Sequence, residues 1–175
     1  MKKPPPMRQG SPDDFQTPAT AIEPLAPYLN PSWRIWEPSC GKGNIVRALQ
    51  AKGFQVHGDD IKATPPRCFL SHDPPPHDCV VTNPPYSIKN EFLARCYRLG
   101  NPFALLMPLT TFDSAERQRL FHEKGIQVLF LPRRVKFETP NGKGSSAWFM
   151  TAWFCWQLGL PATLTFTGLD NPMEI

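Results

Sequence analysis

Short apolar runs that alternate with helix-like segments are the feature that most constrains the fold of this chain. We expect strands over 33–36, 54–57, 67–70, 79–82, 103–107, 126–131 and 148–156. Helical spacing predicts helices after Gly43, over about 89–98, and from Asp113, which has capping-box spacing with Glu116. Unbroken apolar strands between helices are typical of parallel sheets. The sequence therefore predicts an α/β fold, with a seven-stranded, mostly parallel sheet and helices on both faces.

Length and composition are those of one globular domain. The chain has 175 residues, and we expect one domain over 13–160, a disordered tail over 1–12 and a C-terminal tail over 161–175. No apolar run reaches the roughly 18 residues of a membrane span. The five cysteines lack metal-ligand spacing and no export signal precedes them, so we expect reduced thiols, a cytoplasmic location and no metal. The net charge of +4 permits a polyanionic partner.

Three unusual loops each follow a predicted strand, at 37–43, 58–60 and 83–86. Ligands of parallel α/β sheets bind beyond the carboxyl ends of the strands, where the strand order reverses. We therefore expect the three loops to meet at one ligand site.

The first loop, Glu37-Pro38-Ser39-Cys40-Gly41-Lys42-Gly43, allows a ligand to approach bare backbone at its two glycines. It has neither the GxGxxG pattern of dinucleotide sites nor the Gly-Lys-Ser/Thr of a P-loop. The acidic Glu37 argues against a pyrophosphate and favours a cationic or amine-bearing ligand. Taken alone, the loop fits a plain tight turn equally well.

The second loop carries Asp59 and Asp60 at a strand end. A carboxylate in this place accepts hydrogen bonds from ribose hydroxyls, and about twenty residues separate the two acids from Glu37, as in one βαβ unit. A solvated turn is the alternative interpretation of this pair.

The third loop, Asn83-Pro84-Pro85-Tyr86, is the most specific pattern in the chain. Two prolines fix the backbone and remove two N–H donors, which leaves carbonyl groups free to point into a site. The Asn83 side-chain oxygen and the Pro84 carbonyl could accept hydrogens from an amine, and Tyr86 could stack on a planar base. A Pro-Pro turn with an incidental tyrosine is the alternative.

The order Glu-Pro-x-x-Gly-x-Gly, Asp-Asp, Asn-Pro-Pro-Tyr resembles the amino-methyltransferases of the DNA adenine type. Phe15-Gln16-Thr17-Pro18 is similar to the Phe-x-Thr-Pro segment that precedes the cofactor loop in that family. Residues 131–137 and 152–154 resemble the small methyltransferases of phages and prophages. The resemblance covers roughly residues 15 to 156.

This resemblance implies a Rossmann-like class I methyltransferase that moves a methyl group from S-adenosyl-L-methionine to the N6 amine of adenine in DNA. It implies catalytic roles around the target adenine for Asn83, Pro84, Pro85 and Tyr86. It implies cofactor-binding roles for Phe15, Thr17, Glu37, Ser39, Gly41, Gly43, Asp59, Asp60, Ile61, Asp73 and Asn83. Within this set, Asp60 would hold the ribose, and Asp73 would accept a hydrogen bond from the cofactor's adenine.

The expected partner is DNA, as a duplex with a flipped adenine or as a single strand. The basic residues Arg133, Arg134, Lys136 and Lys143 share one polar stretch that could bind phosphate, although a solvated hairpin explains them equally well. The chain leaves no room for a separate target-recognition domain. We therefore expect relaxed or short sequence recognition, by the loops over 132–147 and 65–77.

Other functions share parts of the pattern. Asn-Pro-Pro-Tyr also occurs in enzymes that methylate RNA bases and in those that methylate protein glutamine. The latter usually have a helical domain before the cofactor loop, whereas 36 residues precede Glu37 here. A non-catalytic nucleic-acid-binding module on the same fold is a further alternative. The resemblance implies a bacterial host cell and a phage or prophage origin, and the sequence does not indicate the oligomeric state.

Overall fold

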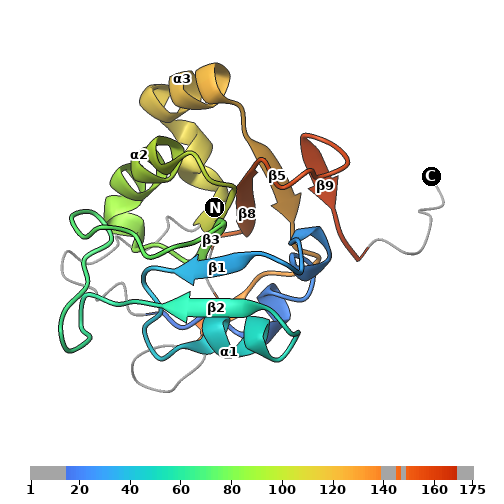
Figure 1. The fold of residues 1–175 in the computed structure, drawn as a ribbon. Helices are drawn as coiled ribbons and strands as arrows, with labels where there is room; N and C mark the ends of the chain where they lie inside the picture. The colour runs from blue at the N-terminus through green and yellow to red at the C-terminus, as the bar shows by residue number, and fades with distance from the viewer. Residues whose placement is uncertain (1–14, 139–144, 147–148, 169–175) are drawn as a thin grey trace, which may run out of the picture.

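The computed structural model describes residues 15–138, 145–146 and 149–168, in which a twisted sheet is covered by helices (Figure 1). The strand order of the main sheet is β2-β1-β3-β4-β8-β5-β9. Its strands are β1 (Arg34–Glu37), β2 (Gln55–Gly58), β3 (Cys79–Thr82), β4 (Phe103–Pro108), β5 (Gln127–Phe130), β8 (Thr151–Trp156) and β9 (Leu164–Phe166). A separate ribbon pairs β6 (Lys136–Phe137) with β7 (Ser145–Ser146).

The described helices are three α-helices and four short 3-10 helices. The α-helices are α1 (Asn44–Gln50), α2 (Lys89–Leu99) and α3 (Ala115–Lys124). The 3-10 helices are η1 (Ala19–Ala21), η2 (Ala26–Tyr28), η3 (Tyr86–Ile88) and η4 (Leu109–Asp113). No described helix has the length and apolar character that crossing a membrane would require.

The seven-stranded, mostly parallel sheet is confirmed, with one strand running the other way. β8 pairs antiparallel with both β4 and β5, whereas the other neighbouring strands pair in parallel. An apolar run in the sequence does not reveal the direction of its strand, because direction depends on pairing and on the length of the connection.

One expected strand and one expected boundary are wrong, although the main sheet has seven strands as predicted. Residues 67–70 form a turn in which Phe69 packs between Trp36 and Phe92, so its apolar character reflects burial rather than strand pairing. The expected tail from residue 161 instead contributes β9, which pairs with β5. Phe166 of β9 stacks on Phe130 with ring centroids 4.5 Å apart.

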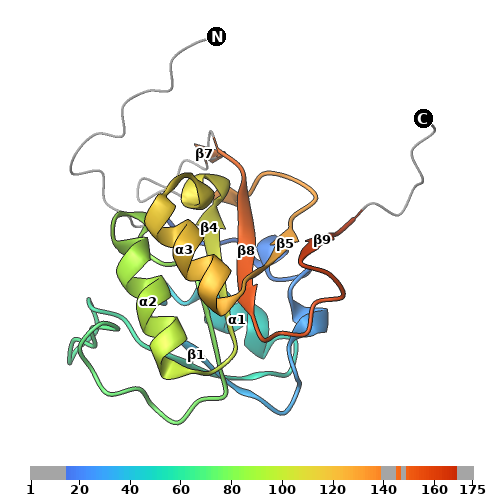
Figure 2. The same ribbon diagram turned by 90° about the horizontal axis from the view of Figure 1, so that it is seen from above.

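The two faces of the sheet form two separate cores. Side chains alternate along each strand, so Ile35 faces the same core as Leu49 of α1, whereas Trp36 faces the core that contains Phe92 of α2. Figure 2 shows α2 and α3 side by side on one face, and Asn90 of α2 is hydrogen-bonded to α3. The expected helices on both faces are confirmed.

The start of α3 differs from the expected capping box. Ser114 is the N-cap residue and makes no side-chain capping bond, and Asp113 is the last residue of η4. The spacing of Asp113 and Glu116 is therefore incidental, because the capping geometry requires extended backbone at the residue before the helix. Gly125 ends α3 as expected.

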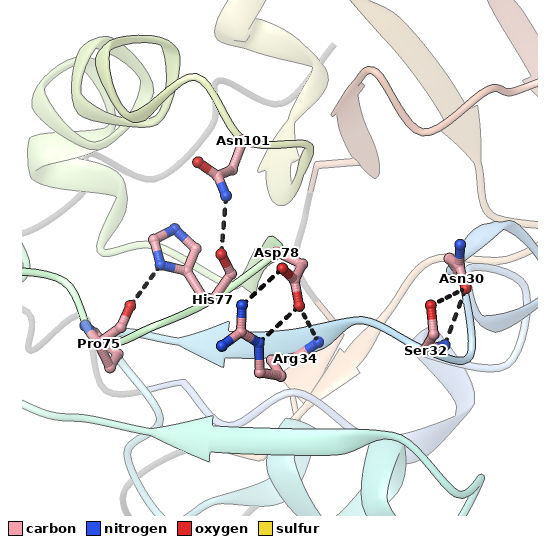
Figure 3. A network of polar contacts seen from close by, with 7 residues as sticks. All are labelled: Asn30, Ser32, Arg34, Pro75, His77, Asp78 and Asn101. Carbon is pink, nitrogen blue, oxygen red and sulfur yellow. Dashed lines mark hydrogen bonds and ion pairs between the residues drawn. The ribbon is translucent and has the colours of Figure 1, made fainter.

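The amino ends of β1 and β3 are joined by a polar network (Figure 3). Asp78 accepts the Arg34 backbone N–H at 2.8 Å and two bonds from its guanidinium group at 2.9 Å. The guanidinium holds the pKa of Asp78 well below its usual range. Asn101 donates to the His77 carbonyl at 2.9 Å, which ties the start of β4 to the same region. This network fixes the ends of the strands opposite the candidate site.

Candidate functional site

A cleft opens at the carboxyl ends of β1 and β3, where the strand order reverses. From β1 the chain goes to β2 on one side and later returns to β3 on the other side of β1. The cleft encloses about 850 Å³ of space, a figure that includes the solvent at its open mouth. It lies where ligands of open α/β sheets bind. It is lined by residues 15–17, 37–41, 44–45, 60–62, 67–70, 83, 85, 88 and 92. All three loops that the sequence indicated contribute to this lining.

The loop after β1 is bonded to the loop after β2. The Gly41 N–H donates to Asp60 Oδ2 at 2.8 Å, and the Cys40 N–H donates to the Asp59 carbonyl at 2.9 Å. Gly41 has a positive φ of +51°, and a Cβ there would lie 2.5 Å from Gln16 Nε2. The backbone conformation therefore favours glycine at this position, and a Cβ would also displace the end of the Gln16 side chain.

Glu37 is fully buried at the end of β1, and only one of its oxygens is bonded within the described part of the chain. Oε1 accepts the Ser39 N–H at 3.0 Å and the Thr82 hydroxyl. Oε2 has no hydrogen-bond partner among the described residues. Burial raises the pKa of Glu37 to about 8, with a smaller contribution from the nearby Asp60 charge. This acid can accept a donor that a ligand brings into the cleft.

The raised pKa of Glu37 makes stability depend on pH. Between about pH 4.5 and 8 the folded protein retains a proton that the unfolded chain releases, so the free energy of unfolding falls as pH rises. We expect a slope of up to about 1.4 kcal/mol per pH unit from this group, measured by urea unfolding. Glu37→Gln should remove this slope, and the exposed Glu91→Gln should leave it unchanged. Equal slopes in the wild type and Glu37→Gln would contradict the assignment.

Asn83 follows β3 and faces the same cleft. Its Nδ2 donates to the Phe15 carbonyl at 3.4 Å, whereas Oδ1 is buried without a hydrogen-bond partner among the described residues. Thr17 Oγ1, in the segment beside it, is likewise buried without a described partner. Together with Glu37 Oε2, the cleft therefore has three polar atoms that the described residues leave unsatisfied, and a buried polar group of this kind is costly unless it is bonded.

The rest of the third loop surrounds Asn83. Pro85 lines the cleft and Pro84 is buried outside the lining. Tyr86 begins η3, and its ring meets Phe149 edge-on with centroids 5.9 Å apart. Tyr86 and Phe149 are not among the residues that line the cleft, although Tyr86 is three residues beyond Asn83 in the chain.

Three of the expected cofactor residues lie outside the lining. Asp59 accepts the Trp36 indole N–H at 3.0 Å and pairs with His57 at 3.1 Å, so its carboxylate is used within the fold. Gly43 is the N-cap of α1, and Asp73 is exposed away from the cleft. Asp60 lines the cleft, as does Ile61 with 62% of its surface exposed.

Two contributions to the site were missed in the sequence. Residues 67–70 line the cleft, whereas we expected a strand there and gave the loop over 65–77 a role in sequence recognition rather than in cofactor binding. Gln16 is buried between the glycine loop and the chain near residue 138, and its Oε1 accepts the Lys42 N–H at 2.9 Å. In the Phe-x-Thr-Pro pattern Gln16 stands at the unspecified position x. The resemblance therefore implied roles for Phe15 and Thr17 but none for Gln16.

The basic stretch lies close to the cleft. Arg133, Arg134 and Lys136 are exposed, and Lys143 lies outside the described residues. Phe137, next to Lys136, meets the ring of Phe15 edge-on with centroids 6.2 Å apart. Because Phe15 lines the cleft, the described basic residues adjoin it.

The fold is the Rossmann-like fold of methyltransferases. A structure described as a candidate RNA methyltransferase from Pyrococcus horikoshii superposes with a TM-score of 0.52 at 15% identity, over 78% of this chain and 82% of that one. A modification subunit of a candidate type I restriction enzyme from Vibrio vulnificus gives a TM-score of 0.52 at 16% identity, over 84% of this chain and 45% of that one. No protein-family model and no curated protein sequence matches the chain.

Proposed function

We propose that this protein transfers a methyl group from S-adenosyl-L-methionine to the N6 amine of adenine in DNA. The main support is Asn83 Oδ1, which is buried and has no hydrogen-bond partner among the described residues. It shares a cleft at the strand-order switch with Glu37 Oε2, for which the described residues likewise provide no partner. One atom can accept from a substrate amine and the other from the amine of the methionine moiety. The resemblance of the three loops to amino-methyltransferases supports the same assignment.

The residues of the cleft fit S-adenosylmethionine. Glu37 would accept its amino group, Thr17 Oγ1 would bond its carboxylate, and Asp60 would accept its ribose hydroxyls. Asp60 already accepts the N–H groups of Gly41 and Lys62 at 2.8 Å, but a carboxylate has about four acceptor sites, so capacity for hydroxyls remains. Ile61 and residues 67–70 would enclose the adenine moiety, since they also line the cleft.

The protein's part in the reaction is to orient the target amine. When bound, the cofactor supplies a methyl group on a sulfonium ion. The Asn83 Oδ1 would accept one amine hydrogen, which directs the nitrogen lone pair toward the cofactor side of the cleft. The resemblance assigns the second amine hydrogen to the carbonyl of Pro84, although Pro84 lies outside the cleft lining. These bonds strengthen as positive charge develops on nitrogen, so they stabilise the transition state more than the bound substrate.

The aromatic pair of Tyr86 and Phe149 offers a surface for a planar base. Stacking of a base on an aromatic side chain contributes about 1–3 kcal/mol, which offsets part of the few kcal/mol needed to flip a base from a duplex. Three exposed cations near the cleft could bind the phosphates that flank the target base; these are Arg133, Arg134 and Lys136.

RNA adenine is the second candidate substrate, because a single-stranded RNA base presents the same amine. Transfer of a labelled methyl group should be measured side by side on duplex DNA, single-stranded DNA, RNA and a glutamine-containing protein. The proposal expects label in DNA, at N6 of adenine. Label in RNA alone or protein alone would overturn the DNA assignment, and no cofactor binding by calorimetry would favour a non-catalytic module.

Removal of two cations beside the cleft should weaken DNA binding in a salt-dependent way. Each phosphate contact contributes about 0.9 to the slope of log affinity against log salt, so Arg133→Ala with Arg134→Ala should lower that slope by about 2. Fluorescence anisotropy at several salt concentrations measures it. Arg119→Ala with Lys124→Ala on α3 removes the same charge elsewhere and serves as the control. An equal change of slope in both double variants would argue against a phosphate contact at 133–134.

A further inference from the structure

Gln16 joins two parts of the molecule that are far apart in the sequence. On one side its Oε1 accepts the Lys42 N–H at 2.9 Å, and its side chain occupies the space beside Gly41. Gln16 is 93% buried, as its exposed fraction of 7% shows. Its side chain therefore helps to fix the conformation of the glycine loop.

On the other side Gln16 is bonded to the chain that follows β6. The backbone of Gln16 and that of Glu138 exchange two N–H···O bonds of 3.0 Å. The Asn44 side chain at the start of α1 also donates to Glu138 Oε1 at 3.3 Å. Glu138 is two residues beyond Lys136, the last described residue of the basic stretch. The buried Gln16 therefore connects the glycine loop to the chain that follows the basic stretch, and Asn44 makes a second, exposed connection from the start of α1.

We propose that Gln16 is a positioning residue that couples the Arg133–Lys136 stretch to the glycine loop, so that DNA and cofactor bind cooperatively. The inference rests on the proposed function. Phosphate held by the basic stretch restricts residues 136–138, and the paired bonds transmit this restriction to Gln16 and then to the Lys42 N–H. DNA binding then supplies part of the free energy that is needed to order the glycine loop. Less of that free energy has to come from the cofactor when it binds. By linkage, the cofactor must strengthen DNA binding by the same factor.

The test measures the dissociation constant of S-adenosylhomocysteine, which cannot donate a methyl group, with and without a saturating adenine-containing duplex. We expect the duplex to tighten binding to the wild type about fivefold or more. Gln16→Met keeps the length of the side chain and removes the acceptor, so the two constants should differ by less than about twofold. Gln16→Glu keeps an acceptor oxygen for the Lys42 N–H and should retain the coupling. Gln118→Met on α3 is the matched control.

The ratio of the two constants separates coupling from a structural role. If Gln16 only supports the fold, Gln16→Met weakens binding equally with and without DNA, and the unchanged ratio overturns the inference. A wild-type ratio near one overturns it as well, while leaving the proposed function intact. A wild type that binds neither S-adenosylhomocysteine nor S-adenosylmethionine overturns the proposed function and the coupling together.

Discussion

Asn83→Ala is expected to reduce the rate constant of methyl transfer about 10²–10³-fold while changing the affinity for S-adenosylmethionine less than about threefold. The rate should fall because the variant loses the Oδ1 acceptor, which would bond the amine as charge develops on nitrogen, and preorganised bonds of this kind contribute a factor of this size. Cofactor affinity should persist because the only described bond from the Asn83 side chain is a long one of 3.4 Å to the Phe15 carbonyl. Single-turnover kinetics and calorimetry give the two quantities.

The control for this variant is Asn101→Ala, at the opposite ends of the strands. Asn101 donates to the His77 carbonyl, so its loss affects packing without touching the cleft. We expect normal transfer from this variant once its fraction folded is taken into account. If Asn83→Ala lost cofactor affinity in the same proportion as rate, Asn83 would be a structural residue and its proposed role would be wrong.

Glu37→Gln should weaken S-adenosylmethionine binding by roughly 10- to 150-fold. A hydrogen bond to a charged group contributes about 1.5–3 kcal/mol, and each 1.4 kcal/mol corresponds to a factor of ten in affinity. Glutamine retains an oxygen for the Ser39 N–H and the Thr82 hydroxyl, so the fold should persist. Calorimetry at pH 7.5 in two buffers of different ionisation enthalpy should also show that the wild type releases a proton on binding, because Glu37 is protonated near neutral pH until a cationic amine arrives.

The matched control is Glu123→Gln, which removes one exposed carboxylate from α3. It should leave both cofactor affinity and proton release unchanged. Wild-type affinity in Glu37→Gln, with proton release retained, would show that Glu37 does not contact the cofactor. The amine of the methionine moiety would then need a different acceptor in the cleft.

The sequence predicted the parts of the fold that depend on local pattern. Apolar residues in short runs indicated β1, β3 and β4. Glycines with a positive φ mark two helix boundaries, at Gly43 and Gly125. The direction of β8 and the existence of β9 depend on partners distant in the sequence. The three residues of β9 are too few for a strand pattern, and two of them remain largely exposed at the sheet edge.

The candidate site could be predicted where it follows from strand ends. Glu37, Asp60 and Asn83 lie in one cleft because the ends of parallel strands meet at the switch in strand order. Which of two adjacent acids lines the cleft depends on the local backbone, and the Asp59 carboxylate is already bonded to Trp36 and His57. The conformation at 67–70 differs from the expected strand because Phe69 packs against Trp36 and Phe92, and the local sequence does not reveal such contacts.

We propose that Asn83 orients the N6 amine of adenine in DNA for methyl transfer. Base-resolution mapping of modified DNA from cells that express the chain, with Asn83→Ala as the comparison, tests this most directly. We expect N6-methyladenine at short or relaxed sites with the wild type and none above background with the variant. Unmodified adenine in both samples, or the same methylation in both, would contradict it.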